Sequence, residues 1–145
     1  MAPLHLFIRR RDGRIEVRVA ESGREFIVKQ MARVAAAESD SAHEWHSYLH
    51  APMNPSADAD DPLRVFERQK ATATNAELAL LSAHEEFINN VEAWAWLTTL
   101  QIALRSEMMA QGVFDSANLD VKSESEVADI RSLQYVLFEL ARVVS

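Results

Sequence analysis

The chain has 145 residues, of which 48% are hydrophobic and 26% are charged, a composition typical of a folded domain. It contains no cysteine, which excludes disulfides, thiolate nucleophiles and zinc–thiolate sites and favours a reducing, cytoplasmic compartment. The net charge of −7 is uneven, because residues 1–34 hold eight Lys/Arg and four Asp/Glu, whereas residues 35–145 hold seven and eighteen. An acidic body repels nucleic acid, so any such contact has to use the basic N-terminal end.

The length predicts a single domain over residues 1–145. We expect a β-hairpin over 1–20, a helix over 21–37, an irregular acidic segment over 38–62 and a helical bundle over 63–145. The expected fold class is mainly α, formally α+β, with an N-terminal β-hairpin packed on a bundle of four to five helices. The apolar stretch at the N-terminus is too short for a signal sequence, and we expect no membrane partner.

The N-terminal hairpin is predicted from two alternating runs on either side of Asp12-Gly13. This dipeptide favours the positive φ angles of a tight hairpin turn. An isolated hairpin is marginally stable in water, so its apolar face has to be covered by a helix. The alternation assigns to that face Leu4, Leu6, Ile8, Ile15, Val17 and Val19.

Local signals mark the beginnings of the expected helices. Ser22 is followed three residues later by a glutamate, the spacing of a capping box, and so is Thr74. Pro62 suits the first position of the helix that begins after the acidic segment. The helix after Thr74 is expected to carry Phe87 and Ile88 in its apolar stripe.

The next expected helix spans residues 91–109, and its uncharged part, 93–104, is far shorter than the roughly 20 residues that cross a bilayer. A helical wheel places Trp94 in the apolar arc and Trp96 about 200° away, on the polar flank. We therefore predict that Trp94 lies in the core. We predict that Trp96 is covered by the acidic segment or by a second subunit. Because aromatic residues are enriched at interfaces, the candidate interface residues are Trp96, Leu100 and Ala103.

The two last helix boundaries are also marked. Gly112 is predicted to close the helix of residues 91–109 in the C′ position. Ser123 and Glu126 form a third capping-box spacing, and apolar residues then recur at helical intervals to the C-terminus.

Five arginines gather in the predicted hairpin, and guanidinium groups match phosphates and carboxylates in bidentate geometry. A two-stranded ribbon can enter the major groove of duplex DNA. The same cluster can instead dock on an acidic protein, or simply prevent edge-to-edge pairing of strands. The candidate docking or nucleic-acid residues are Arg9, Arg10, Arg11, Arg14 and Arg18.

Three histidines, His43, His46 and His50, have spacings that place them on one face of a short helix. Three imidazoles can bind zinc, nickel or copper and leave a coordination position open, so a metal-binding protein or metal-dependent enzyme is an alternative. A polar surface face is the plainer interpretation of the same residues. No glycine-rich phosphate loop or nucleophile elbow occurs, so we expect neither an enzyme nor a cofactor.

The order of these features resembles an actinobacterial family of unknown function, whose members are sometimes described as oxidative-stress or transcriptional regulators. The stretch "FIRRRDGRIEVRVAESGREFIVKQM" resembles the family's arginine-rich hairpin and first helix, and "DADDPLRVF" resembles its acidic Asp-Pro middle. The family's Trp-Leu-x-x-Leu helix and its Leu-Gln helix are matched by Trp96, Leu97, Leu100, Gln101, Gly112, Val113, Leu133 and Gln134. The resemblance implies a regulator.

We therefore predict a non-enzymatic regulatory or protein-interaction module that acts as a homodimer, with the arginine hairpin as its docking surface for a protein or duplex DNA. A structural subunit without a ligand is the third alternative.

Overall fold

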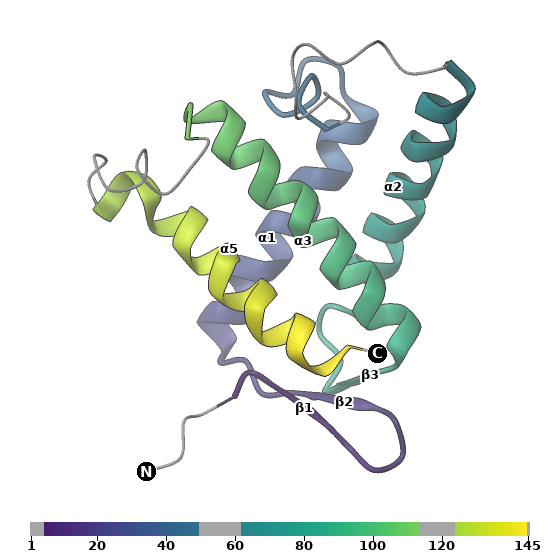
Figure 1. Ribbon diagram of the computed structural model, residues 1–145, viewed down its shortest axis with the longest axis vertical. Helices are drawn as coiled ribbons and strands as arrows, with labels where there is room; N and C mark the ends of the chain where they lie inside the picture. The colour runs from purple at the N-terminus through teal and green to yellow at the C-terminus, as the bar shows by residue number, and fades with distance from the viewer. Residues whose placement is uncertain (1–4, 50–61, 114–123, 145) are drawn as a thin grey trace.

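The computed structural model describes residues 5–49, 62–113 and 124–144 of the chain. Figure 1 shows a small antiparallel sheet at one end of a bundle of long helices, which confirms the expected fold class. The elements in chain order are β1 (Phe7–Arg9), β2 (Ile15–Val17), α1 (Glu21–Ser39), α2 (Pro62–Ser82), β3 (Phe87–Ile88), α3 (Asn90–Ala110) and α5 (Glu124–Val143). Within the described ranges, none of the helices has the length and apolar character needed to cross a membrane.

Helix α3 is the central helix of the bundle and packs against α1, α2 and α5 (Figure 1). Its N-terminus is fixed by a capping box, in which Asn89 accepts a hydrogen bond from the Glu92 backbone and the Glu92 side chain accepts one from the Asn89 backbone. Its C-terminus is closed by Gly112, as predicted. Gly112 has φ +68°, and the Gly112 and Val113 amides donate to the Met109 and Met108 carbonyls, which is a Schellman motif.

The predicted orientation of the two tryptophans of α3 is wrong. Trp96 is fully buried, whereas 47% of Trp94 is exposed. The indole Nε1 of Trp96 donates to the Ser82 hydroxyl of α2 at 2.8 Å, and its ring meets Phe7 of β1 edge-on at 6.1 Å. Trp96 therefore joins the sheet to two helices.

The reversal follows from the central position of α3. A helix covered on several sides has no single apolar arc, so a wheel that looks for one arc can choose the wrong side. Most of the supposed polar flank beside Trp96 is buried. Its buried members are Thr99, Ala103, Ser106 and Glu107.

The N-terminal hairpin forms as predicted, but its turn is longer than a two-residue loop. The Gly13 amide donates to the Arg10 carbonyl, and the Arg10 amide donates to the Arg14 carbonyl. Within this turn only Gly13, with φ +91°, has a positive φ angle, which indicates a type I turn followed by a glycine bulge. The resulting register pairs Phe7 with Val17 and Arg9 with Ile15.

That register places Phe7, not Ile8, on the covered face of β1, so the predicted inward side of the first strand is wrong. Phe7 is fully buried against the helices, together with Ile15 of β2. A shift of one residue along a strand turns every side chain to the opposite face, and both faces of this strand carry apolar residues. The alternation pattern therefore did not distinguish the covered face of the strand from the open one.

A third strand, β3, was not expected, because Phe87 and Ile88 were assigned to a helix. Helix α2 ends at Ser82, and β3 pairs antiparallel with β2 through Ile15–Ile88 and Glu16–Phe87. Ile88 completes the buried face of the sheet, and Phe87 lies on the opposite face.

The first helix begins at residue 21 as predicted, but the cap predicted at Ser22 and the helix start predicted at Thr74 are wrong. Helix α1 begins at Glu21 after the N-cap Ala20, with no side-chain cap, so Ser22 lies inside the helix. Helix α2 is continuous from Pro62, and the Thr74 hydroxyl donates to the Lys70 carbonyl at 2.9 Å within it. The alanine-rich sequence around Thr74 favours continuing the helix over restarting it. Ser123 lies outside the described residues.

Candidate docking surface on the N-terminal sheet

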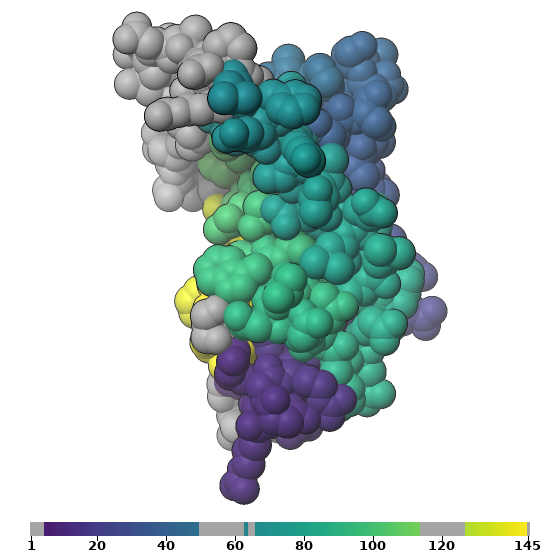
Figure 2. Space-filling model, turned by 90° about the vertical axis from the view of Figure 1, so that its right-hand side faces the viewer, coloured from purple at the N-terminus to yellow at the C-terminus, as the bar shows by residue number. Residues whose placement is uncertain are grey.

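The face of the sheet that points away from the helices carries most of the predicted arginine cluster. Strand alternation and register place its residues, since Ile8, Glu16 and Phe87 are paired neighbours across the three strands. In Figure 2 the hairpin (purple) forms one end of the molecule. We call this face the outer sheet face and define it as Ile8, Arg10, Arg14, Glu16, Arg18 and Phe87.

Glu16 is the centre of the outer sheet face and holds two arginines. Arg10 Nε donates to Glu16 Oε1 at 3.1 Å, and Arg18 Nε donates to Glu16 Oε2. The two arginines leave only 13% of the Glu16 side chain exposed, while 43% of Arg10 and 49% of Arg18 remain exposed. The hydrogen bonds from Arg18 and Arg10 lower the pKa of Glu16, although burial opposes this. Glu16 is therefore ionised at neutral pH and orders both guanidinium groups.

Arg14 is held in a third fixed position. Its Nε donates to Asp12 Oδ2 at 2.8 Å, and its guanidinium carbon lies 4.4 Å from the centre of the Phe87 ring. The Arg14 backbone amide also donates to Asp12, and this bond, followed by the side-chain bond from Arg14, lowers the pKa of Asp12. The outer sheet face thus combines ordered cations with two partly buried apolar side chains, Ile8 and Phe87.

The other two predicted arginines have different environments. Arg9 lies on the helix side of the sheet, where its Nη1 donates to the Val143 carbonyl near the C-terminal end of α5 at 2.8 Å. Arg11 is exposed in the turn, and among the described residues no hydrogen bond or ion pair involves its side chain. Only three of the five arginines therefore belong to the outer sheet face, with Arg11 at its rim.

The sheet is attached to α5 by a polar cluster around Glu139, which is only 4% exposed. Glu139 Oε1 accepts from the Leu6 amide at 2.9 Å and lies 3.3 Å from His5 Nδ1, while Arg142 Nη2 donates to the Phe7 carbonyl at 2.9 Å. Burial favours the neutral acid, but the Leu6 amide, His5 and Arg142 together lower the pKa of Glu139. This cluster provides hydrogen-bond partners for the Leu6 amide and the Phe7 carbonyl, and so fixes the orientation of the sheet relative to α5.

The predicted subunit-interface residues Trp96, Leu100 and Ala103 are all fully buried within one chain. They present no surface to a second subunit, so this assignment is wrong, for the reason given for the tryptophan reversal. Large apolar side chains that are exposed on α3 and α5 are Val91, Trp94, Tyr135 and Phe138.

The histidine prediction is only partly covered by the structure, because His50 lies outside the described residues. Residues 41–49 form successive turns, in which His43 Nδ1 accepts from the Trp45 amide at 3.1 Å and His46 Nδ1 lies 2.6 Å from the Ala37 carbonyl oxygen. Among the residues that the structure places, no group of three His, Asp or Glu side chains could hold a metal ion. The metal site stays a prediction.

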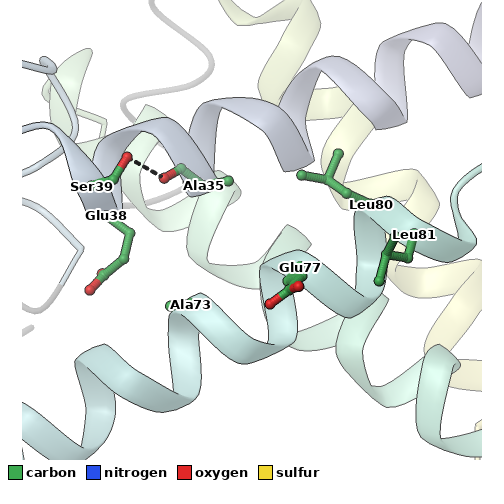
Figure 3. Close-up of a pocket in the computed structure, with 7 residues that line it drawn as sticks. All are labelled: Ala35, Glu38, Ser39, Ala73, Glu77, Leu80 and Leu81. Atoms are coloured by element: carbon green, nitrogen blue, oxygen red, sulfur yellow. Dashed lines mark hydrogen bonds between the residues drawn. The ribbon is translucent and has the colours of Figure 1, made fainter.

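Helices α1 and α2 are separated by an open groove of about 410 Å3. Figure 3 shows Glu38 directed from α1 toward α2, with Glu77, Leu80 and Leu81 on the opposite wall. The groove is mostly apolar, and its two carboxylates come from different helices. Ser39 also lines the groove, and its hydroxyl lies 3.3 Å from the carbonyl oxygens of Ala35 and Ala36 in its own helix.

Comparison with family models, curated proteins and solved structures finds no match for this chain. The resemblance to the actinobacterial regulator family stays a prediction.

Proposed function

We propose that the protein is a non-enzymatic interaction module that binds an acidic partner protein through the outer sheet face. The single observation that carries the proposal is the arrangement of Arg10, Arg14 and Arg18 around Ile8 and Phe87. The three guanidinium groups are oriented by Glu16 and Asp12 before any partner arrives, so little side-chain entropy is lost on binding.

Surface composition favours a protein over duplex DNA as the partner. Arginine and aromatic residues are both enriched in protein interfaces. Glu16 and Asp12 neutralise part of the arginine charge, and exposed Glu85 and Glu86 lie just before β3. The remaining positive charge is small beside the acidic body, and affinity for DNA depends on neutralising many phosphates at once.

Binding of a labelled oligoglutamate peptide, with labelled duplex DNA as comparison, tests the proposal. We expect peptide binding that weakens with salt and is reduced about tenfold by Arg14→Glu, because this change removes one cation and repels the ligand. Arg131→Glu alters the charge equally at an exposed site on α5 and should have little effect. Equal effects of the two variants, or stronger binding to DNA than to the peptide, would refute the proposal.

We further propose that the protein forms a homodimer through the exposed aromatic residues Trp94, Tyr135 and Phe138. Exposed large aromatic side chains are typical anchors of an interface. Light scattering after size exclusion should give a dimer mass for the wild type and a monomer mass for Phe138→Ser. A monomer at tens of micromolar wild-type protein rules the dimer out. In the role that the family resemblance implies, such a dimer would present two outer sheet faces to a transcription- or stress-linked partner.

A further inference from the structure

A second surface hollow, distinct from the sheet, lies between α2, α3 and the turn segment that ends at Leu49. It has a volume of about 270 Å3. Its walls carry two arginines, two threonines and an asparagine, and among the described residues none that lines it is acidic. The residues are Leu49, Arg68, Ala71, Thr72, Asn75, Thr98, Ile102 and Arg105.

Arg105 is a half-buried cation, and its hydrogen-bond partners among the described residues are all neutral. Its Nη2 donates to the Tyr48 carbonyl at 3.1 Å and to the Leu49 carbonyl, and its buried Nε has no hydrogen-bond partner. No carboxylate of the described residues pairs with it. Burial and then the positive charge of Arg68, which lines the same hollow, lower the pKa of Arg105.

Arg68 and Arg105 both line this hollow, so an anion bound there would be attracted by both guanidinium groups. Guanidinium groups bind oxyanions through paired, charge-assisted hydrogen bonds. Thr72 and Thr98 add hydroxyl groups and Asn75 adds an amide, which can bind further oxygens of the same ligand. The volume lies just below the usual range for small-molecule sites, which begins at about 300 Å3, so only a compact ligand fits.

We propose that the hollow between α2 and α3 is a binding site for a small oxyanion, with Arg68 and Arg105 as its charged contacts. Phosphate and a short dicarboxylate share this chemistry. Inorganic phosphate and succinate therefore serve as two separate probes, which distinguish a tetrahedral phosphate from a planar carboxylate.

The test is isothermal titration calorimetry of the full chain with each probe, at an ionic strength held constant with sodium chloride. We expect saturable binding of at least one probe. Arg68→Gln should weaken it about tenfold, because one charge-assisted contact is lost. Thr98→Val should weaken it less, and Arg131→Gln, at an exposed site on α5, should leave it unchanged. Arg68 is exposed, so its replacement is expected to leave the fold intact, and circular dichroism checks this.

Binding of neither probe would overturn the proposal, and so would affinity that Arg68→Gln leaves unchanged. Arg105→Gln is a weaker test alone, because Arg105 also holds the Leu49 carbonyl and its loss can disturb the fold. Loss of peptide binding at the outer sheet face would not affect this result, since the two sites share no residue.

Discussion

Replacing Trp96 with phenylalanine tests the arrangement of the bundle more sharply than any other core substitution. Trp96 is fully buried, donates a hydrogen bond to Ser82 and meets Phe7 edge-on. Phenylalanine keeps an aromatic ring but loses the hydrogen bond and leaves space where part of the indole was. The matched control is Trp94→Phe, the same chemical change two residues away at a half-exposed position.

The expected loss of stability is the sum of two effects. Loss of the hydrogen bond costs about 1 kcal/mol, and Ser82 is not orphaned because its hydroxyl also donates to the Leu78 carbonyl. The smaller ring costs about 1–2 kcal/mol in lost transfer energy and a residual cavity. Trp96→Phe should therefore lower the free energy of unfolding by about 2–3 kcal/mol, and Trp94→Phe by less than about 0.5 kcal/mol.

Urea unfolding followed by circular dichroism measures both values. With a slope of about 1–3 kcal/mol per molar urea, the midpoint of Trp96→Phe should fall by about 0.7–3 M, and that of Trp94→Phe should fall several times less. Acrylamide quenching of tryptophan fluorescence gives a second readout, because Trp94→Phe removes the most accessible indole. Equal losses, or a larger loss in Trp94→Phe, would show that this account of α3 is wrong.

Three further predictions concern the ion pairs and the hairpin turn. Glu107→Ala should lower the free energy of unfolding in urea by about 2 kcal/mol, because it breaks the 3.2 Å ion pair with Arg33 between α3 and α1. The loss is smaller than the roughly 3–5 kcal/mol expected for a fully buried pair, since 23% of the Arg33 side chain is exposed. The pKa of Glu139 is lowered on folding, so its stabilising contribution is complete above its unfolded-state pKa and is lost as the pH falls through the folded-state value. The difference in unfolding free energy between wild type and Glu139→Gln should therefore shrink from pH 7 to pH 3. A constant difference would contradict this. Gly13→Ala should cost about 1 kcal/mol in thermal unfolding, because φ is +91° while the added methyl group meets no atom within 4 Å; an unchanged midpoint would contradict the turn geometry.

Features of the fold that depend on a few neighbouring residues could be predicted from the sequence. Gly112 ends α3 because a residue without a side chain adopts a positive φ angle at little cost. Pro62 begins α2, where its missing amide proton is not needed. The hairpin and the first helix follow from similarly local patterns.

Features that depend on distant partners could not be predicted. Trp96 is buried because Ser82 of another helix accepts its N–H and Phe7 of the sheet meets its ring. Phe87 joins the outer sheet face only because β3 pairs with β2, and a two-residue strand is too short to show alternation. The hollow of Arg68 and Arg105 was missed for the same reason, since the two residues lie on different helices.

The arginine cluster shows both situations. Its location in a hairpin was apparent from alternation and from Asp12-Gly13. How the arginines divide between the two faces of the sheet was not apparent from the sequence. Only the register reveals that Arg9 lies toward α5, whereas Arg10 and Arg18 both pair with Glu16. Pairing with Glu16 also changes what the cluster can bind, since charge that is already neutralised is not available to a nucleic acid.

The most direct test of the proposed docking function is the affinity of the labelled oligoglutamate peptide for Glu16→Gln and Glu77→Gln. Both variants remove one negative charge, but only Glu16 pairs with the arginines of the outer sheet face. Glu16→Gln loses part of the ordering of Arg10 and Arg18 but frees their charge for the peptide. We expect the freed charge to have the larger effect and to tighten binding about fivefold, while Glu77→Gln on α2 should change it little. If both variants tighten binding equally, the peptide responds only to net charge, and the outer sheet face is not the docking surface.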